Sequence, residues 1–158
     1  MLHFTFHDLE PLEGPSAGLG LCDLTVSGNL GSASSHGLQP NASMMVVPSL
    51  ASLLFAVTSI LSPRAKTAHA AFEATASPFT LTFRRSARGV RVSGSGGEID
   101  QGSVESFTAA VHRDVVGFAT LLIGSLPPDE DGTADLHEAV TAFTRAAPVP
   151  PPIRPALP

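Results

Sequence analysis

Four of the nine basic residues fall within one short segment, at Arg84, Arg85, Arg88 and Arg91. A guanidinium group can bind a carboxylate or a phosphate through two parallel hydrogen bonds. Arg84 and Arg91 are expected close together on the outer face of a β-hairpin, where they would bind an acidic partner or another anion. The competing interpretation is a solvated turn whose charges keep the sheet soluble and prevent edge pairing. No aromatic residue alternates with the arginines, as a platform for stacking nucleic-acid bases would require.

The histidines do not form a metal-binding pattern. His3 and His7 share one face of a predicted strand but lie about 13 Å apart along it, too far to bind one metal ion together. His69, His112 and His137 belong to other elements, without the spacing of metal ligands. We therefore expect no metal site.

The templates for nucleophilic and metal-assisted catalysis fail at particular residues. The segment from His137 to Thr141 has a hydroxyl where a zinc-protease helix needs its second histidine. No general base is placed beside Cys22, which is better explained as a small apolar residue of a strand. The Gly-rich segment 93–97 has neither the spacing of a nucleophile elbow nor that of a dinucleotide-binding loop.

A cluster of acidic residues precedes the last predicted helix. Asp129, Asp131 and Asp135 are reminiscent of a calcium loop, but Gly132 comes two positions too early for that motif. Acidic side chains are favourable at the positive end of a helix, which explains the cluster without a ligand. We expect no catalytic residue and no cofactor.

The elements that position the arginines form a predicted β-meander over residues 79–100. Phe79, Leu81 and Phe83 alternate with threonines, the period of a strand with one buried face. Gly89 favours a turn, and the alternation resumes at residues 90–92. A second turn at 93–97 leads into a third short strand. Further strands are expected at 2–7, 22–27 and 69–75, with weak pairing at 30–36.

The least polar stretch, residues 44–61, contains no charge over 18 residues. A transmembrane helix needs roughly 20 apolar residues, and Pro48 interrupts this stretch. The preferred interpretation is a short strand over 44–47 followed by a buried helix over 48–61, with Pro48 in the first helical turn.

Two further helices are expected at 103–123 and 134–146. Ser103 is a suitable N-cap for the first, which Gly124 would end. Strands and helices in this order predict an α+β fold, in which about three helices cover one face of a mainly antiparallel sheet. Residues 1–146 are expected to form a single domain. Six of the twelve residues in 147–158 are proline, which predicts a disordered tail.

The strand Phe79–Arg85, its Gly-rich return, the helix from Ser103 and the acidic entry to Asp135 together resemble a family of short, uncharacterised α+β proteins from GC-rich bacteria. The resemblance covers about two thirds of the chain. Its motifs are structural, so it implies a fold but no catalytic residue.

The amino-acid composition of the chain reduces the number of functions that it is expected to have. A net charge of −5 over 158 residues argues against general nucleic-acid binding. A single cysteine and an N-terminus without signal-peptide character predict a cytoplasmic protein. We therefore predict a non-enzymatic interaction module of the immunity or adaptor type, with a protein partner that is acidic. The alternatives are a small-molecule pocket or active site between the sheet and helix 103–123, and membrane attachment through 44–61.

Overall fold

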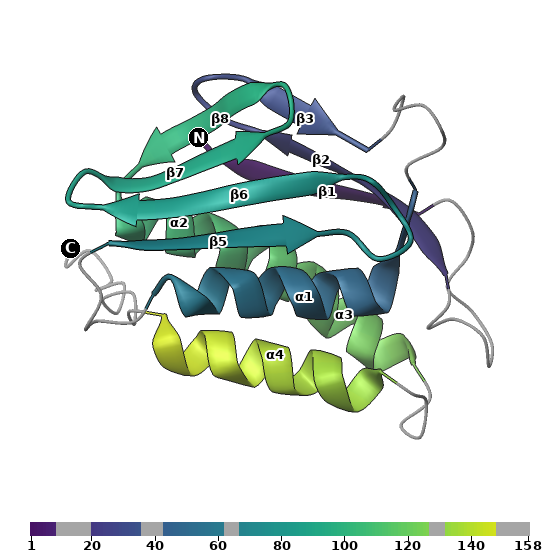
Figure 1. The fold of residues 1–158 in the computed structure, drawn as a ribbon. Helices are drawn as coiled ribbons and strands as arrows, with labels where there is room; N and C mark the ends of the chain where they lie inside the picture. The colour runs from purple at the N-terminus through teal and green to yellow at the C-terminus, as the bar shows by residue number, and fades with distance from the viewer. Residues whose placement is uncertain (9–19, 36–42, 62–66, 127–131, 148–158) are drawn as a thin grey trace, which may run out of the picture.

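A computed structural model describes residues 1–8, 20–35, 43–61, 67–126 and 132–147 of the chain. The predicted α+β fold is confirmed, with antiparallel sheets packed against helices (Figure 1). The proline-rich tail beyond residue 147, Asp129 and Asp131 lie outside the described residues, so the predictions for them remain predictions.

Sheet B is the meander expected from the sequence. Its strands follow chain order, and each pairs antiparallel with the next. They are β5 (Ala68–Glu73), β6 (Thr80–Ser86), β7 (Gly89–Gly94) and β8 (Gly97–Gly102). Leu81 and Phe83 on β6 and Val92 on β7 are buried on one face, as their alternation predicts. Gly89 has a φ of 110°, a conformation that the tight β6–β7 turn requires and that glycine adopts without strain.

The remaining strands form a second sheet, which the sequence did not predict as separate. Sheet A contains β1 (His3–Asp8), β2 (Leu21–Ser27), β3 (Ser32–Ser34) and β4 (Met44–Met45), with β1, β3 and β4 each paired to β2. The β2–β3 turn lies against β8, where the backbone N–H groups of Leu30 and Gly31 both donate to the carbonyl of Ile99 at 2.9 and 3.1 Å. A Cβ at Gly28 would lie 2.5 Å from Asp100, so the close approach of the two sheets needs glycine there.

Helix α1 (Val46–Ser59) is the apolar helix predicted at 48–61. Its residues Leu50, Leu53, Leu54 and Val57 are at most 1% exposed. Pro48 lies in the first turn, where its missing N–H leaves no hydrogen bond unmade. α1 runs beside β5, and it begins where Met45 N–H donates to the Thr75 carbonyl at 3.0 Å.

The long helix predicted from residue 103 is present but irregular. It comprises α2 (Val104–Val111), one π-helical turn at His112–Val116, and α3 (Gly117–Ser125). The Ser103 hydroxyl accepts a hydrogen bond from the Ser106 N–H at 3.1 Å, which confirms the predicted N-cap. Gly124 lies within the helix instead of ending it. By length and composition this helix, Val104–Ser125, could cross a membrane. A helix in a protein core meets the same criteria, and 44% of the most apolar window of this helix is buried.

Helix α4 (Thr133–Ala146) packs along α1 and completes the helical layer (Figure 1). Aromatic contacts connect the long helix to both sheets. Phe107 lies against Phe83 of sheet B with ring centroids 5.8 Å apart, and Phe118 stacks on Phe6 of sheet A at 4.8 Å. The two sheets therefore share one core with the helices.

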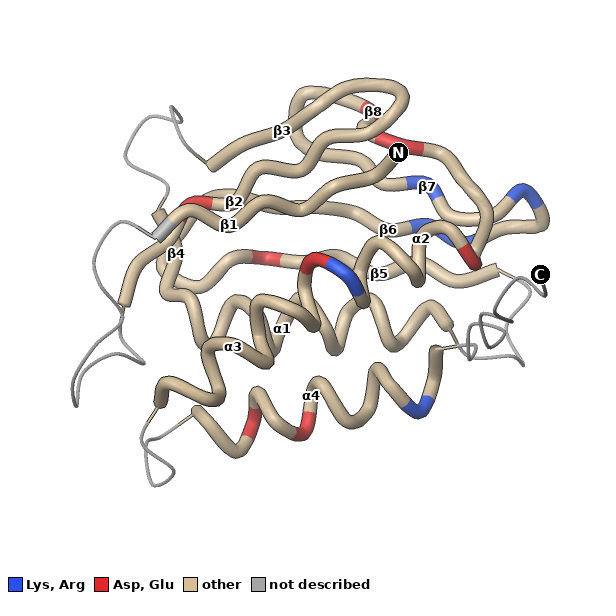
Figure 2. Tube along the Cα trace, turned by 180° about the vertical axis from the view of Figure 1, so that it is seen from behind, with Lys and Arg blue, Asp and Glu red and all other residues tan. Residues whose placement is uncertain are grey.

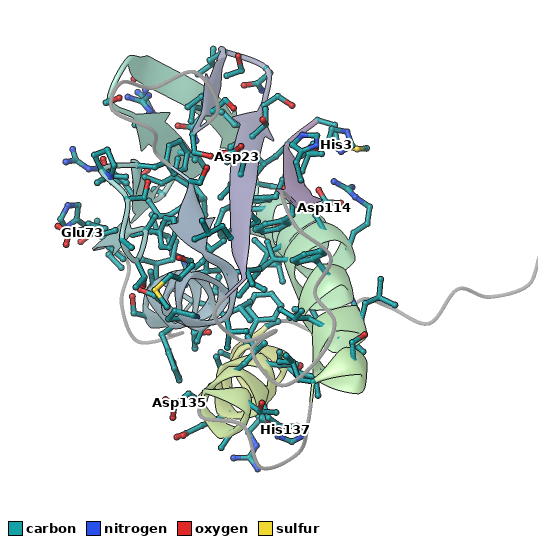
Figure 3. The ribbon with its side chains drawn as sticks, turned by 90° about the vertical axis from the view of Figure 1, so that its right-hand side faces the viewer. His3, Asp23, Glu73, Asp114, Asp135 and His137 are labelled. Carbon is teal, nitrogen blue, oxygen red and sulfur yellow. The ribbon has the colours of Figure 1, made fainter. Side chains whose placement is uncertain are left out.

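The π-helical turn carries an ionic anchor for the first strand. Asp114 accepts a hydrogen bond from the Phe4 N–H at 2.9 Å and two from Arg113, at 2.8 and 2.9 Å. Arg113 also donates to the Leu2 carbonyl at 2.8 Å, and its Nη2 lies 3.2 Å from the ring of His3. Figure 3 shows His3 beside Asp114. Partial burial by itself would raise the pKa of Asp114. The hydrogen bonds from Arg113 and Phe4 and the nearby positive charges outweigh that effect and hold this pKa below its ordinary value.

Replacing the carboxylate with an amide tests this anchor. A group with a lowered pKa in the folded state stabilises above its unfolded pKa and loses that contribution as pH falls through the folded value. We expect Asp114→Asn to lower the free energy of unfolding by about 1 kcal/mol near neutral pH. The deficit should shrink as pH falls through the lowered pKa of Asp114, below the ordinary range of a carboxyl group. Urea unfolding of both proteins across this pH range measures it, and a deficit independent of pH would contradict the ionic anchor.

Candidate functional site

Two of the four candidate arginines face each other across sheet B. Arg84 on β6 and Arg91 on β7 are directly paired in the antiparallel register. His69 on β5 pairs with Arg84 from the other side. These three residues, here called the basic row, cross three adjacent strands on one face of the sheet, and all three are exposed. The helices lie on the opposite side, and no described element covers this face (Figure 1).

The basic row places the positively charged side chains of Arg84 and Arg91 opposite each other. Side chains directly opposite each other in an antiparallel pair have Cβ atoms about 5 Å apart, and like charges there are destabilising. Arg91 is partly compensated, because it donates to Glu98 at 2.7 Å and to Gln101 at 3.1 Å. Both members of the Arg91–Glu98 pair are more than 40% exposed, so the pair contributes little stability. Within the described residues Arg84 has no ion pair of its own.

Arg85 lies on the other face of the same strand. It pairs with the buried Val90, and its Nη1 donates to the Ile60 carbonyl at 3.1 Å, just past the end of α1. A cation at the C-terminus of a helix satisfies a free carbonyl and interacts favourably with the helix dipole. Arg85 therefore holds α1 to sheet B.

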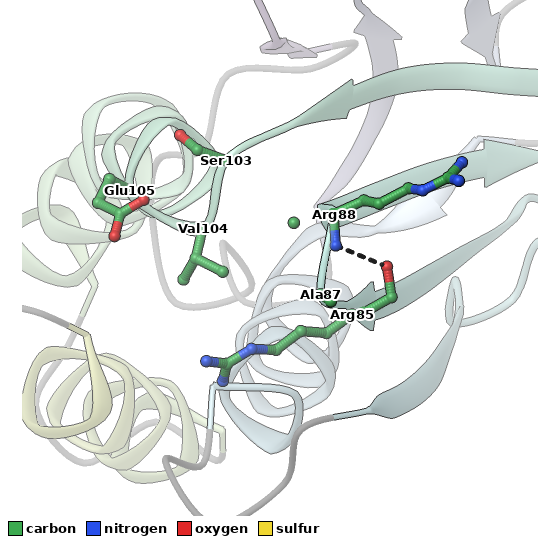
Figure 4. Close-up of a pocket in the computed structure, with 8 residues that line it drawn as sticks. Arg85, Ala87, Arg88, Ser103, Val104 and Glu105 are labelled. Carbon is green, nitrogen blue, oxygen red and sulfur yellow. Dashed lines mark hydrogen bonds between the residues drawn. The ribbon is translucent and has the colours of Figure 1, made fainter.

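Arg88 occupies the β6–β7 turn, and its backbone is well fixed. Its N–H donates to the Ser86 hydroxyl at 3.2 Å, and its carbonyl accepts from the Gln101 side chain at 3.1 Å. Beside this turn is a hollow of about 430 Å³ that reaches the first turn of α2. Figure 4 shows the Arg88 side chain directed away from this hollow, while Glu105 lines the opposite wall. The hollow is lined by the side chain of one cation, Arg85, and by the acidic Glu105, so it does not gather several cations around an anion.

Arg88 nevertheless extends the basic surface beyond the sheet face. Arg88 is exposed in the β6–β7 turn, and Figure 2 shows that basic positions gather along β6, β7 and this turn. The structure thus brings together Arg84 and Arg91, places Arg88 at the margin and separates Arg85 from them.

The sequence did not identify His69, Glu98 or Gln101 as parts of this surface. His69 was treated as an isolated histidine because its alignment with Arg84 depends on the β5–β6 register. That register follows from matching the buried Phe72 to Leu81, and the alternation in both strands contained this signal.

The other candidate residues are spread over separate elements of the described part of the chain. His3 and His7 are exposed on β1, and Cys22 is fully buried in β2. Thr141 donates its hydroxyl to the carbonyl of His137 within α4, as helix threonines commonly do. Among the residues that the structure describes, no three His, Cys, Asp or Glu side chains are grouped so that they could hold a metal ion.

Asp23 and Ser35 form a buried polar pair in sheet A, and the described contacts of this pair hold strands together. Ser35 donates to Asp23 at 2.7 Å and accepts from the Leu24 N–H at 2.9 Å, so it ties β2 to the end of β3. Ser43 contributes a longer contact of 3.5 Å to the same carboxylate oxygen.

Comparison with known proteins adds no further residue assignments. The chain matches no protein-family model, no curated protein and no solved structure. The assignment of a function therefore depends on the geometry of the exposed sheet face.

The different placements of Arg84 and Arg85 lead to opposite expectations for stability. Arg85→Met removes the hydrogen bond to Ile60 and should lower the free energy of unfolding by about 1 kcal/mol. Arg84→Met is the matched control, because it removes an equally long side chain from the exposed face and should change stability by less than about 0.5 kcal/mol. Thermal or urea unfolding distinguishes them, and equal losses would contradict the structural role of Arg85.

Proposed function

We propose that this protein is a non-enzymatic interaction module, of the immunity or adaptor type, that binds an acidic protein partner through the outer face of sheet B. The observation that supports this proposal is the basic row, in which two arginines and a histidine lie exposed on three adjacent strands. A carboxylate placed between Arg84 and Arg91 would bind both guanidinium groups and relieve their repulsion. Strands position such groups more firmly than loops do.

The net charge of the whole chain would orient an acidic partner as it approaches the basic row. The net charge is −5, so most of the surface repels an acidic partner while the basic row and Arg88 attract it. Such an asymmetry orients a partner during approach and raises the association rate more than the final affinity. Binding through this face should therefore depend strongly on salt.

The alternative functions have less support. A pocket between the sheet and the long helix is restricted to the hollow beside the β6–β7 turn, because Phe107 and Val111 fill the space farther along the helix and are at most 2% exposed. Attachment to a membrane through residues 44–61 would need the apolar side chains of α1 to face outward, and most of them are buried.

Charge reversal on the basic row tests the proposal. The wild-type protein and the double variant Arg84→Glu/Arg91→Glu are immobilised and exposed to extract of the source organism. The partner is the acidic protein retained by wild type and lost from the variant. With that protein purified, calorimetry should show roughly tenfold weaker binding by the variant and a flatter dependence on salt. If every retained protein binds both equally, the proposed function is wrong.

A substitution of Glu98 is expected to strengthen partner binding, whereas charge reversal of the arginines is expected to weaken it. The Glu98 carboxylate already occupies Arg91, so it competes with the carboxylate of a partner. Glu98→Gln removes this competition and one repulsive charge, and should tighten binding about two- to fivefold. The substitution Glu73→Gln also removes one negative charge from β5, but it lies farther from the arginines and should have a smaller effect. Equal effects would mean that net charge alone governs binding.

A further inference from the structure

We infer that the partner presents its acidic side chains on an α-helix that crosses the strands of sheet B along the basic row. This inference depends on the proposed function and specifies the partner. The acidic residues would follow the pattern i, i+3 or i+4, and i+7, one for each of His69, Arg84 and Arg91.

The spacing of the basic row matches a helix better than it matches an extended chain. Neighbouring strands lie about 4.8 Å apart, so the three positions occur at about 0, 4.8 and 9.6 Å. A helix rises about 1.5 Å per residue, which places positions i, i+3 and i+7 at about 0, 4.5 and 10.5 Å on one face. An extended chain repeats a face every two residues, or about 6.7 Å, and falls out of step by the third position.

The surface beside the basic row leaves room for the helix itself. The next row on the same face, here called the small row, consists of Ala71, Thr82 and Ser93, which are paired across the same three strands. Small side chains permit a helix backbone to approach the sheet closely, so that its acidic side chains can reach sideways to the arginines. No charged residue occupies these three positions.

Two carboxylates determine which side of the helix carries the acids. Glu98 pairs with Ser93 and so extends the small row onto β8, and Glu73 lies on β5 beyond Ala71. Both are exposed. Glu73 repels acidic side chains from the far side of the small row, and Glu98 repels them from its β8 end. A neutral face of the partner helix therefore lies over the small row, and its acidic face points to the basic row.

Three acidic peptides with equal numbers of glutamates, and one neutral control, test this geometry against the full chain. The first is a stapled helix with glutamates at i, i+3 and i+7, and the second is a stapled helix with glutamates every five residues, spread around the helix. The third is an extended peptide with glutamates at alternate positions, and a stapled helix with glutamine in place of glutamate is the neutral control. Binding is followed by the amide chemical shifts of His69, Arg84 and Arg91.

We expect the first helix to bind about fivefold more tightly than the second or the third, and Arg84→Gln to remove most of that advantage. Equal binding of all three acidic peptides would overturn the helical partner while leaving an acidic partner in place. Tighter binding of the extended peptide would do the same. If no acidic peptide binds better than the neutral control, the proposed function fails together with this inference.

Discussion

The alternation of side chains along β6 and β7 is the constraint on which the rest of this structure depends. Burial of Leu81, Phe83 and Val92 on one face fixes the register of the two strands, because a slip by one residue would expose all three. Burying each such side chain contributes about 1.5–3 kcal/mol relative to exposure. That energy is large enough to hold Arg84 directly opposite Arg91 despite their repulsion, which is the arrangement that gives the outer face its character.

The same inner face explains how the two sheets and the helices are combined. Phe83 contacts Phe107, and Phe6 of the other sheet contacts Phe118, so the long helix is held by both sheets. The π-helical turn between these contacts positions Asp114 against the Phe4 N–H. A π turn adds a residue to one turn of a helix and changes the direction of the side chains that follow it. The helix thereby makes an aromatic contact with each sheet and, between the two, an ionic contact with β1 of sheet A.

Local patterns predicted most of the individual elements. The alternation of Phe79, Leu81 and Phe83, the turn at Gly89 and the N-cap at Ser103 depend on a few neighbouring residues, so the sequence alone was sufficient to place them. The division into two sheets was not predictable in this way, because it depends on the β2–β3 turn meeting β8 some 70 positions later in the chain, as the bond from the Asn29 N–H to Asp100 illustrates. The π turn likewise has no local signal, since the apolar stripe continues through it.

The surface around the basic row was likewise predicted only in part. Some of its features depend on neighbouring residues, and others depend on residues far away in the sequence. The alternation of side chains between the two faces of a strand predicted that Arg84 and Arg91 point outward. Arg85 was grouped with them because adjacent arginines look equivalent in a sequence, whereas adjacent residues of a strand point to opposite faces. His69 could be added only through the register of β5, and the pairing of Arg91 with Glu98 only through that of β8.

The basic row is unusual for a face that serves only solubility. A solvated sheet face is most stable when opposite charges face each other across strands, as in the contact between Arg91 and Glu98. Glu98 reaches Arg91 but leaves Arg84 facing a second cation and an imidazole. Replacing Arg84 or Arg91 with threonine, the residue found at neighbouring outward positions of β6, would remove the repulsion without disturbing the core. The row is therefore not required by the fold, and a carboxylate-bearing partner gives a physical reason for three adjacent basic side chains on an open and rigid surface.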